Sequence, residues 1–185
     1  GCSVIAAAIV LERLWTLQKR RVLPADLTRQ VWEWVSRNEL NHAHIQELQA
    51  GSPLGQILAA GLLNRHRDRQ IMKESIEDTG RHVVHELDRF IGTLGMIASL
   101  SPLMGLLGTV MGMIRTFNAI TTAGIGNPTA LAGGIAEALI TTAAGLAVAI
   151  PAMIAFSFFR NKIDSIVAEC GKRVDRVLMP LSRKR

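Results

Sequence analysis

The sequence has 185 residues, of which 49% are hydrophobic, with a mean hydropathy of +0.25 and a net charge of +6. A chain this apolar is unlike an ordinary soluble domain. Its 21 Lys and Arg residues are not accompanied by a nucleic-acid-binding motif with interleaved aromatic residues, which argues against RNA or DNA as a partner. The composition therefore favours a membrane protein.

The first residues have the features of an incomplete membrane span. Residues 1–11 carry no charge, and Glu12, Arg13 and Trp15 follow, which is typical of a membrane interface. A hydrocarbon core about 30 Å thick needs roughly 20 helical residues, so this stretch is too short to cross it. We expect residues 1–15 to be the C-terminal part of a first transmembrane helix whose upstream residues are missing. A cleaved signal-peptide remnant or a short buried helix is the alternative.

Residues 16–89 are predicted to form a cytoplasmic helical region. Asp26 precedes a first run of apolar residues at helical spacing, residues 36–49 are polar, and Pro53 opens a second apolar run. The simplest interpretation of such apolar stripes is packing between helices.

Apolar positions between Ile71 and Phe90 lead into the next apolar segment without a strong helix breaker. This pattern predicts one long helix over residues 68–117, with Gly80 as its weakest internal point.

Two long apolar segments follow. The only charge between Arg89 and Arg160, apart from Arg115, is Glu137. We predict a second transmembrane helix at residues 90–117 and a third at residues 129–159. The connection between them, residues 118–128, contains four residues that break or start helices: Gly124, Gly126, Asn127 and Pro128.

The basic residues predict the orientation. Twelve of the 21 Lys and Arg lie in residues 12–89, and eight lie from Arg160 onward. Basic segments face the cytoplasm, where they also contact anionic lipid. We therefore expect residues 160–185 to be a cytoplasmic helix and basic tail, and residues 118–128 to be a periplasmic turn. The expected fold is an all-α, multi-pass bacterial inner-membrane protein with three transmembrane helices, long helical cytoplasmic extensions and a periplasmic N-terminus.

Small and hydroxylated residues recur at alternating spacings of three and four in both long segments, which places each set on one helix face. The first set is Pro102, Gly105, Thr109, Gly112 and Thr116. The second is Ala138, Thr142, Gly145, Ala149 and Ala152. Such stripes commonly mediate close helix packing, and they equally suit the lining of a lumen.

Glu137 is a candidate functional residue because a lone carboxyl group in an apolar span costs several kcal/mol unless it is protonated, paired or hydrated. Thr141 lies one turn away on the same face, and Thr142 lies well around the helix. A structural alternative is a hydrated Glu137 near the membrane surface, paired with Arg115 across the hairpin.

The sequence gives no sign of an enzyme. It has no nucleophile with an adjacent base, no cofactor motif and no metal-ligand spacing among its five histidines, so neither cofactor nor metal is expected. The two cysteines, Cys2 and Cys170, are expected near opposite membrane faces and unpaired.

Two segments resemble a known family. The residues LLGTVMGMIRTF at 106–117 and GIAEALITTAAGLAVAIPA at 134–152 are similar to the last two spans of the ExbB/TolQ/MotA proton-channel family, and to ExbB most of all. The segments ERLW at 12–15 and SPLG at 52–55 also resemble ExbB, so the likeness covers most of the chain.

The resemblance implies a homopentamer whose second and third spans surround two helices of an ExbD-like single-span partner. An aspartate on that partner is thought to carry the proton. The positions that match the family's lumen-facing polar residues are Thr109, Glu137 and Thr142, and we add Thr141 and Thr116 as candidate members of the proton pathway. Pro102, Gly105, Gly112, Ala138, Gly145 and Ala149 are expected on the packing or lumen face.

The function implied is to use the proton motive force, through a TonB-like protein, to energise outer-membrane transport. A TolQ-type role in the envelope through TolR and TolA is the alternative within the family, while MotA normally has four spans. A non-conducting membrane scaffold is the alternative outside the channel function.

Overall fold

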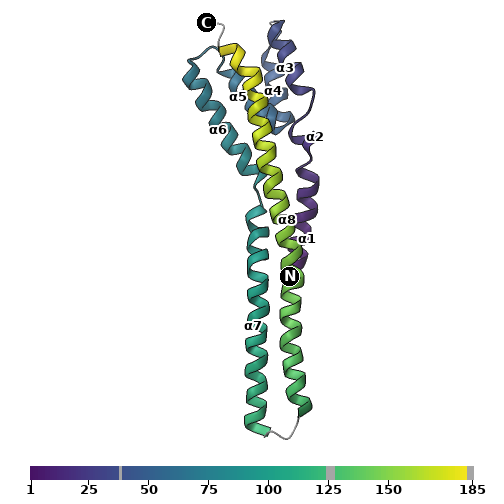
Figure 1. Cartoon of the computed structure of the whole chain (residues 1–185). Coiled ribbons are helices and arrows are strands. Elements are labelled where there is room, and N and C mark those ends of the chain that lie inside the picture. The colour runs from purple at the N-terminus through teal and green to yellow at the C-terminus, as the bar shows by residue number, and fades with distance from the viewer. Residues whose placement is uncertain (38, 124–127, 183–185) are drawn as a thin grey trace. The chain divides into compact units, whose positions relative to one another are not determined.

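The computed structural model describes residues 1–37, 39–123 and 128–182. These ranges contain eight α-helices and no strand (Figure 1). The helices are α1 (Cys2–Thr16), α2 (Lys19–Val22), α3 (Leu27–Ser36), α4 (His42–Gly51), α5 (Pro53–Leu63), α6 (Arg69–Leu87), α7 (Ile91–Ala123) and α8 (Pro128–Ser182). The expected all-α fold is confirmed in the described residues.

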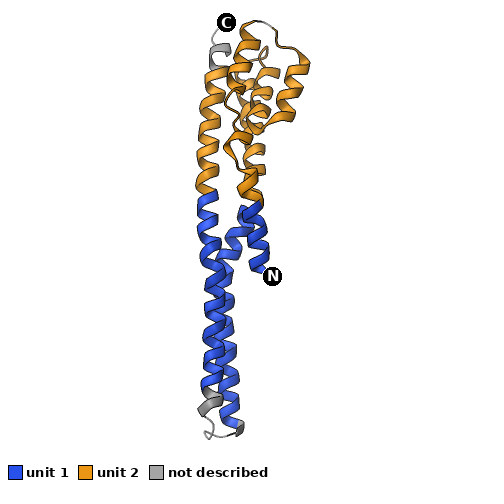
Figure 2. Cartoon of the chain, turned by 90° about the vertical axis from the view of Figure 1, so that its right-hand side faces the viewer, with its two compact units in different colours: residues 1–11, 90–159 blue, residues 12–89, 160–185 orange. Residues whose placement is uncertain are grey.

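The chain divides into two compact units (Figure 2). Unit 1 contains Gly1–Leu11 and Phe90–Phe159, and unit 2 contains Glu12–Arg89 and Arg160–Arg185. Both units therefore combine segments that are far apart in the sequence.

Unit 2 is built around α5, whose side chains are almost all buried. Leu54, Leu58 and Leu62 are fully inaccessible. The helix begins where the sequence predicts, because Pro53 occupies its first turn and the Ser52 hydroxyl accepts a hydrogen bond from the Gly55 N–H. An apolar helix of this length is thus a core element of unit 2.

Helix α4 forms in the segment that the sequence analysis treated only as polar. Asn41 caps it by accepting a hydrogen bond from the His44 N–H, and Ile45 and Leu48 are buried on one face. The ring of His44 stacks on Trp34 with centroids 4.3 Å apart. His44 is therefore part of the packing between α3 and α4.

The prediction of one continuous helix over residues 68–117 is wrong. Helix α6 ends at Leu87, and residues 88–90 form a turn in which Phe90 has a φ of 63°. The Leu87 carbonyl accepts a hydrogen bond from Nη1 of Arg13, a residue 74 positions away that is only 3% exposed. A buried guanidinium thus satisfies a carbonyl group that a continuing helix would use. Gly80 stays inside an unbroken α6.

Helices α7 and α8 are the two helices long and apolar enough to cross a membrane among the described residues, over Ile91–Thr121 and Ala132–Leu178. Only 22% and 11% of their most apolar windows are buried in the chain, which is unlike the core helices of a soluble protein. Helix α8 starts at Pro128 and runs without a break to Ser182, as the predicted extension requires. The predicted turn residues Gly124, Gly126 and Asn127 lie outside the described residues.

The first of the three expected spans is not confirmed. Helix α1 has 15 residues, fewer than the roughly 20 that cross a bilayer. Ala6 and Ile9 are nevertheless buried, so the N-terminal segment of unit 1 packs against its neighbours.

Candidate functional site in the helical hairpin

The candidate site lies in unit 1, where α7 and α8 run side by side (Figure 1). Their small residues face one another. A Cβ atom added to Gly145 would lie 2.7 Å from the carbonyl oxygen of Ser101 and 3.0 Å from the Cα atom of Gly105. The two backbones therefore approach closely here because glycine leaves room on both helices.

Thr142 joins the helices at this point. Its hydroxyl donates a hydrogen bond to the carbonyl oxygen of Gly105 across 3.1 Å. Gly105 is buried, and Thr142 is half-buried. A side-chain hydrogen bond between apolar helices adds directional stabilisation where the hydrophobic effect between helices in lipid is weak.

The close packing continues toward the hairpin turn. A Cβ atom at Gly112 would lie 2.8 Å from the Cβ atom of Ala138. Gly134 lies against the Thr116 hydroxyl, and Gly108 lies against Thr141 in the same way. The predicted stripes of small residues are thus the surfaces along which α7 and α8 meet within one chain.

The other threonines of the candidate pathway bond to their own helix. The hydroxyl groups of Thr109, Thr116 and Thr141 donate to the carbonyl oxygens of Leu106, Gly112 and Ala138, at 2.6, 2.9 and 2.7 Å. Such back-bonding satisfies the hydroxyl proton locally and leaves acceptor lone pairs on the oxygen. These threonines therefore need no external partner to be stable in an apolar setting.

Glu137 forms an ion pair with Arg115 across the hairpin. Its Oε1 lies 3.5 Å from Nη1 of Arg115, and the side chains are 65% and 70% exposed in the single chain. The pairing considered as the structural alternative is thus present. An unpaired charge in a membrane span is costly, so each group of this pair reduces the cost of placing the other there.

The remaining predicted residues also lie along the hairpin. Pro102 is half-buried inside α7, and Ala149 is buried on α8. Three of the contact residues described above, Ser101, Gly108 and Gly134, were not in the predicted set. Ser101 and Gly108 lie four and three residues from the predicted Gly105, and Gly134 lies four residues from the predicted Ala138, so the same spacing rule could have found them.

Large apolar side chains cover the outer faces of the hairpin and remain exposed in the single chain. On α7 they include Met96, Leu103, Met104 and Phe117, and on α8 they include Leu139, Ile140, Met153 and Ile154. An exposed apolar surface this extensive requires lipid or other protein chains around it.

The sequence matches the MotA/TolQ/ExbB proton channel family over residues 49–172, a range that includes α5, α6, α7 and most of α8. This chain belongs to the MotA/TolQ/ExbB family. As a member of that family it is a membrane protein whose hairpin lies inside the matched range.

Three relatives illustrate the likeness. An ExbB-like biopolymer transport protein of Synechocystis is 35% identical over 157 residues, covering 83% of this chain and 62% of that protein. The biopolymer transport protein ExbB of Salmonella typhimurium is 32% identical, with 80% and 69% covered. The Tol-Pal system protein TolQ of Haemophilus influenzae is 28% identical, with 98% and 85% covered.

This member of the MotA/TolQ/ExbB family spans less than two thirds of the length of the Synechocystis relative. One relative named ExbB and one named TolQ each match it across most of its length. The chain therefore belongs to a family that includes both ExbB and TolQ, and this membership does not separate the two.

Proposed function

We propose that this chain is the proton-channel and stator subunit of an inner-membrane motor of the ExbB–ExbD type, which uses the proton motive force to energise TonB-dependent outer-membrane transport. The observation that supports this most is the hairpin itself. It combines apolar, largely exposed helices with threonine hydroxyls and a Glu137–Arg115 pair. Polar and ionisable groups inside membrane segments are costly and mark ion pathways more often than structural sites.

The threonine oxygens can bind a proton-carrying carboxyl group for a short time. In this proposal an acidic side chain of the partner passes Thr109, Thr141 and Thr142, whereas Thr116, which is 5% exposed and lies against Gly134, is a packing residue. A protonated carboxyl group would donate to the oxygens of Thr109, Thr141 and Thr142, which retain lone pairs although their protons are already engaged. Such contacts hold the carboxyl group at each station without trapping it.

Glu137 and Arg115 act in this proposal as the charged entry to the pathway. Their exposure in the single chain allows either one to exchange its partner for a group on a neighbouring helix. Moving one elementary charge across 100 mV releases about 2.3 kcal/mol, which is enough to bias a conformational step of a few RT.

The assembly proposed is a homopentamer around two copies of an ExbD-like single-span partner, coupled to a TonB-like protein. The exposed apolar side chains of α7 and α8 support an environment of lipid and further copies. We place the two spans, residues 90–117 and 129–159, in the inner membrane. Residues 16–89 and 160–185 lie in the cytoplasm, next to anionic lipid, and the N-terminus lies on the periplasmic side.

A TolQ-type role is the second candidate. It is favoured by one observation, that the alignment with the Haemophilus influenzae TolQ protein covers 98% of this chain and 85% of that protein. In this role the same hairpin chemistry would serve the Tol-Pal envelope system instead of TonB.

Deletion of the gene in its own host separates the two roles. The ExbB-type role predicts loss of growth on receptor-dependent iron complexes with an intact outer-membrane barrier. The TolQ-type role predicts detergent sensitivity and division defects with normal iron uptake. Full complementation of either phenotype by a double variant with apolar residues at positions 137 and 142 would contradict proton conduction through the hairpin and favour a passive scaffold.

A further inference from the structure

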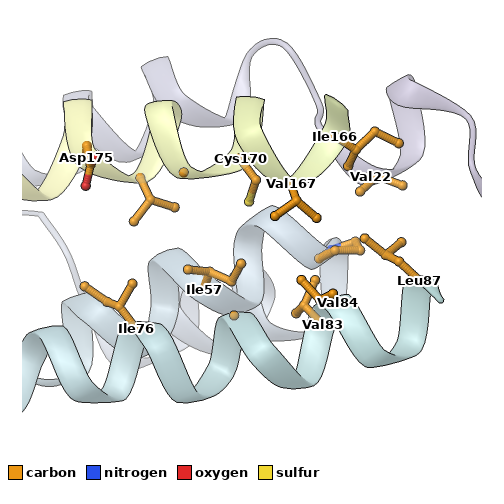
Figure 3. Close-up of a pocket in the computed structure, with 14 residues that line it drawn as sticks. Val22, Ile57, Ile76, Val83, Val84, Leu87, Ile166, Val167, Cys170 and Asp175 are labelled. Carbon is orange, nitrogen blue, oxygen red and sulfur yellow. The ribbon is translucent and has the colours of Figure 1, made fainter. Parts of the chain in front are cut away.

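Unit 2 contains a partly open apolar cavity between α6 and α8, which α5 and Val22 also line (Figure 3). Its volume is about 180 Å³. Of the 14 residues that line it, Asp175 alone carries a charge. The walls are mainly branched aliphatic side chains such as Ile57, Val83 and Ile166. An apolar molecule that filled it would remove this apolar surface from water, which is favourable.

Two glycines keep this cavity open. Gly80 on α6 and Gly171 on α8 both line it, and a Cβ atom added to either would find no other atom within 4 Å. Both lie inside helices, where alanine is favoured over glycine by about 0.8–1.0 kcal/mol. Both positions therefore have space for a side chain, and alanine at either would stabilise its helix more than glycine does.

Cys170 contributes an uncharged side chain to the wall of the cavity. Its side chain points from α8 toward α6 in Figure 3, and the residue is only 6% exposed. Burial raises the pKa of the Cys170 thiol to about 11, so at neutral pH the group is protonated and behaves as a small hydrophobic side chain. The thiol also provides a chemical reporter inside the cavity.

Asp175 lies at one end of the cavity, on the α8 side. A carboxylate there repels a second carboxylate and leaves an uncharged group unaffected. Fatty acids and other small organic acids are therefore disfavoured relative to neutral molecules of the same length.

We propose that this cavity is a binding site for an uncharged hydrocarbon group of about six carbon atoms. The size follows from engineered apolar cavities of about 150 Å³, which bind benzene. A free small molecule and the end of a lipid acyl chain share this chemistry. The proposal is independent of the function assigned to the hairpin, because every residue of the site belongs to unit 2.

The test measures how fast Cys170 reacts with a small neutral thiol reagent in the full chain, held in amphipol without phospholipid. The exposed Cys2 is first replaced by Cys2→Ser so that one thiol remains. We expect 1-hexanol to slow the reaction at least fivefold and hexanoate to leave it unchanged. Asp175→Asn should allow hexanoate to protect as well.

Filling the cavity provides the matched comparison. Gly80→Leu should abolish protection by 1-hexanol, whereas Gly51→Leu should retain it, because Gly51 also has open space around it but does not line the cavity. If Gly80→Leu fails to fold, the smaller pair of changes Gly80→Ala and Gly171→Ala should weaken protection at least threefold.

Phosphatidylcholine vesicles distinguish the two sources. Protection by vesicles as well as by 1-hexanol supports an acyl chain as the occupant, and protection by 1-hexanol alone supports a free molecule. Equal reaction rates with and without 1-hexanol up to its solubility limit, together with an unchanged thermal unfolding temperature, would overturn the proposal.

Discussion

Thr142 on α8 donates a hydrogen bond to the backbone carbonyl oxygen of Gly105 on α7. The bond exists because Gly105 has no side chain that would separate the helices, and because Gly145 lies one turn along α8 at a similar close approach. The candidate pathway is therefore also a helix-packing surface, and experiments must separate the two roles.

Thr142→Val should weaken the contact between α7 and α8. Hydrogen bonds between membrane helices average about 0.6 kcal/mol, so the loss in stability should be of this size. Thr142→Ser should retain the bond. Unfolding in mixed micelles measures the difference, with Thr121→Val as control because the Thr121 hydroxyl bonds within α7 to Asn118. A Thr142→Val variant as stable as the unaltered protein, combined with an unstable Thr142→Ser variant, would show that the methyl group, which valine keeps, matters and the hydroxyl does not.

Gly145→Ala should destabilise the hairpin by about 1–3 kcal/mol, the usual cost of overpacking. The new Cβ atom would meet backbone atoms of Ser101 and Gly105, which cannot rotate away. Gly133→Ala is the matched control on the same helix, because its Cβ atom would meet nothing within 4 Å. It should be neutral or stabilising by up to about 1 kcal/mol. Equal effects of the two changes would contradict the close approach.

Arg115→Gln and Glu137→Gln each remove one partner of an ion pair between two apolar helices of the membrane hairpin, so each should lower stability. Under the proposed function each should also reduce proton-coupled uptake strongly. The exchanged pair Arg115→Glu with Glu137→Arg restores the ion pair. Recovery of uptake in the exchanged variant indicates that pairing is what matters, whereas continued loss indicates that each group must keep its own position.

Phe90→Gly should be more stable than Phe90→Ala by about 1 kcal/mol. Phe90 has a φ of 63°, a left-handed conformation that costs any residue with a Cβ atom about 1–2 kcal/mol and glycine much less. Both changes remove the same aromatic ring, so their difference isolates the backbone. Equal thermal unfolding temperatures would argue against the turn between α6 and α7.

Acidification should weaken unit 2 through Glu169. Hydrogen bonds from Lys19 and from Arg173, each 2.7 Å long, lower the pKa of the Glu169 carboxyl group. Because the folded-state pKa lies below the ordinary value, the stabilisation is complete above that ordinary value and is lost as the pH falls through the folded value. Glu169→Gln should lower stability at neutral pH and flatten this acid-dependent loss, as should Lys19→Gln. An unchanged pH profile in both variants would contradict the ion-pair assignment.

Local sequence signals were sufficient for several features. Pro53 predicted the start of α5, Pro128 predicted the start of α8, and a helix was expected to continue after Arg160, as α8 does. Each depends on residues within a few turns of the feature, which is the range over which helix propensity and capping act.

Features set by distant contacts could not be predicted in this way. At the end of α6 the Leu87 carbonyl oxygen accepts a hydrogen bond from Arg13, 74 positions away, and no periodicity within α6 reports that contact. The centre of the α7 stripe lay nearer to Ser101 and Gly108 than expected, because the register of two helices is fixed by both surfaces together. The partner helix of the proposed pathway is a separate chain, so no pattern in this sequence describes it.

The most direct test is proton flux into liposomes that contain this chain together with the proposed ExbD-like partner, under an imposed membrane potential. The account predicts flux that falls at least tenfold with Glu137→Gln and with Thr142→Val, while Thr121→Val conducts like the unaltered protein. Undiminished flux in both pathway variants, with assembly verified, would contradict the claim that protons pass along this hairpin.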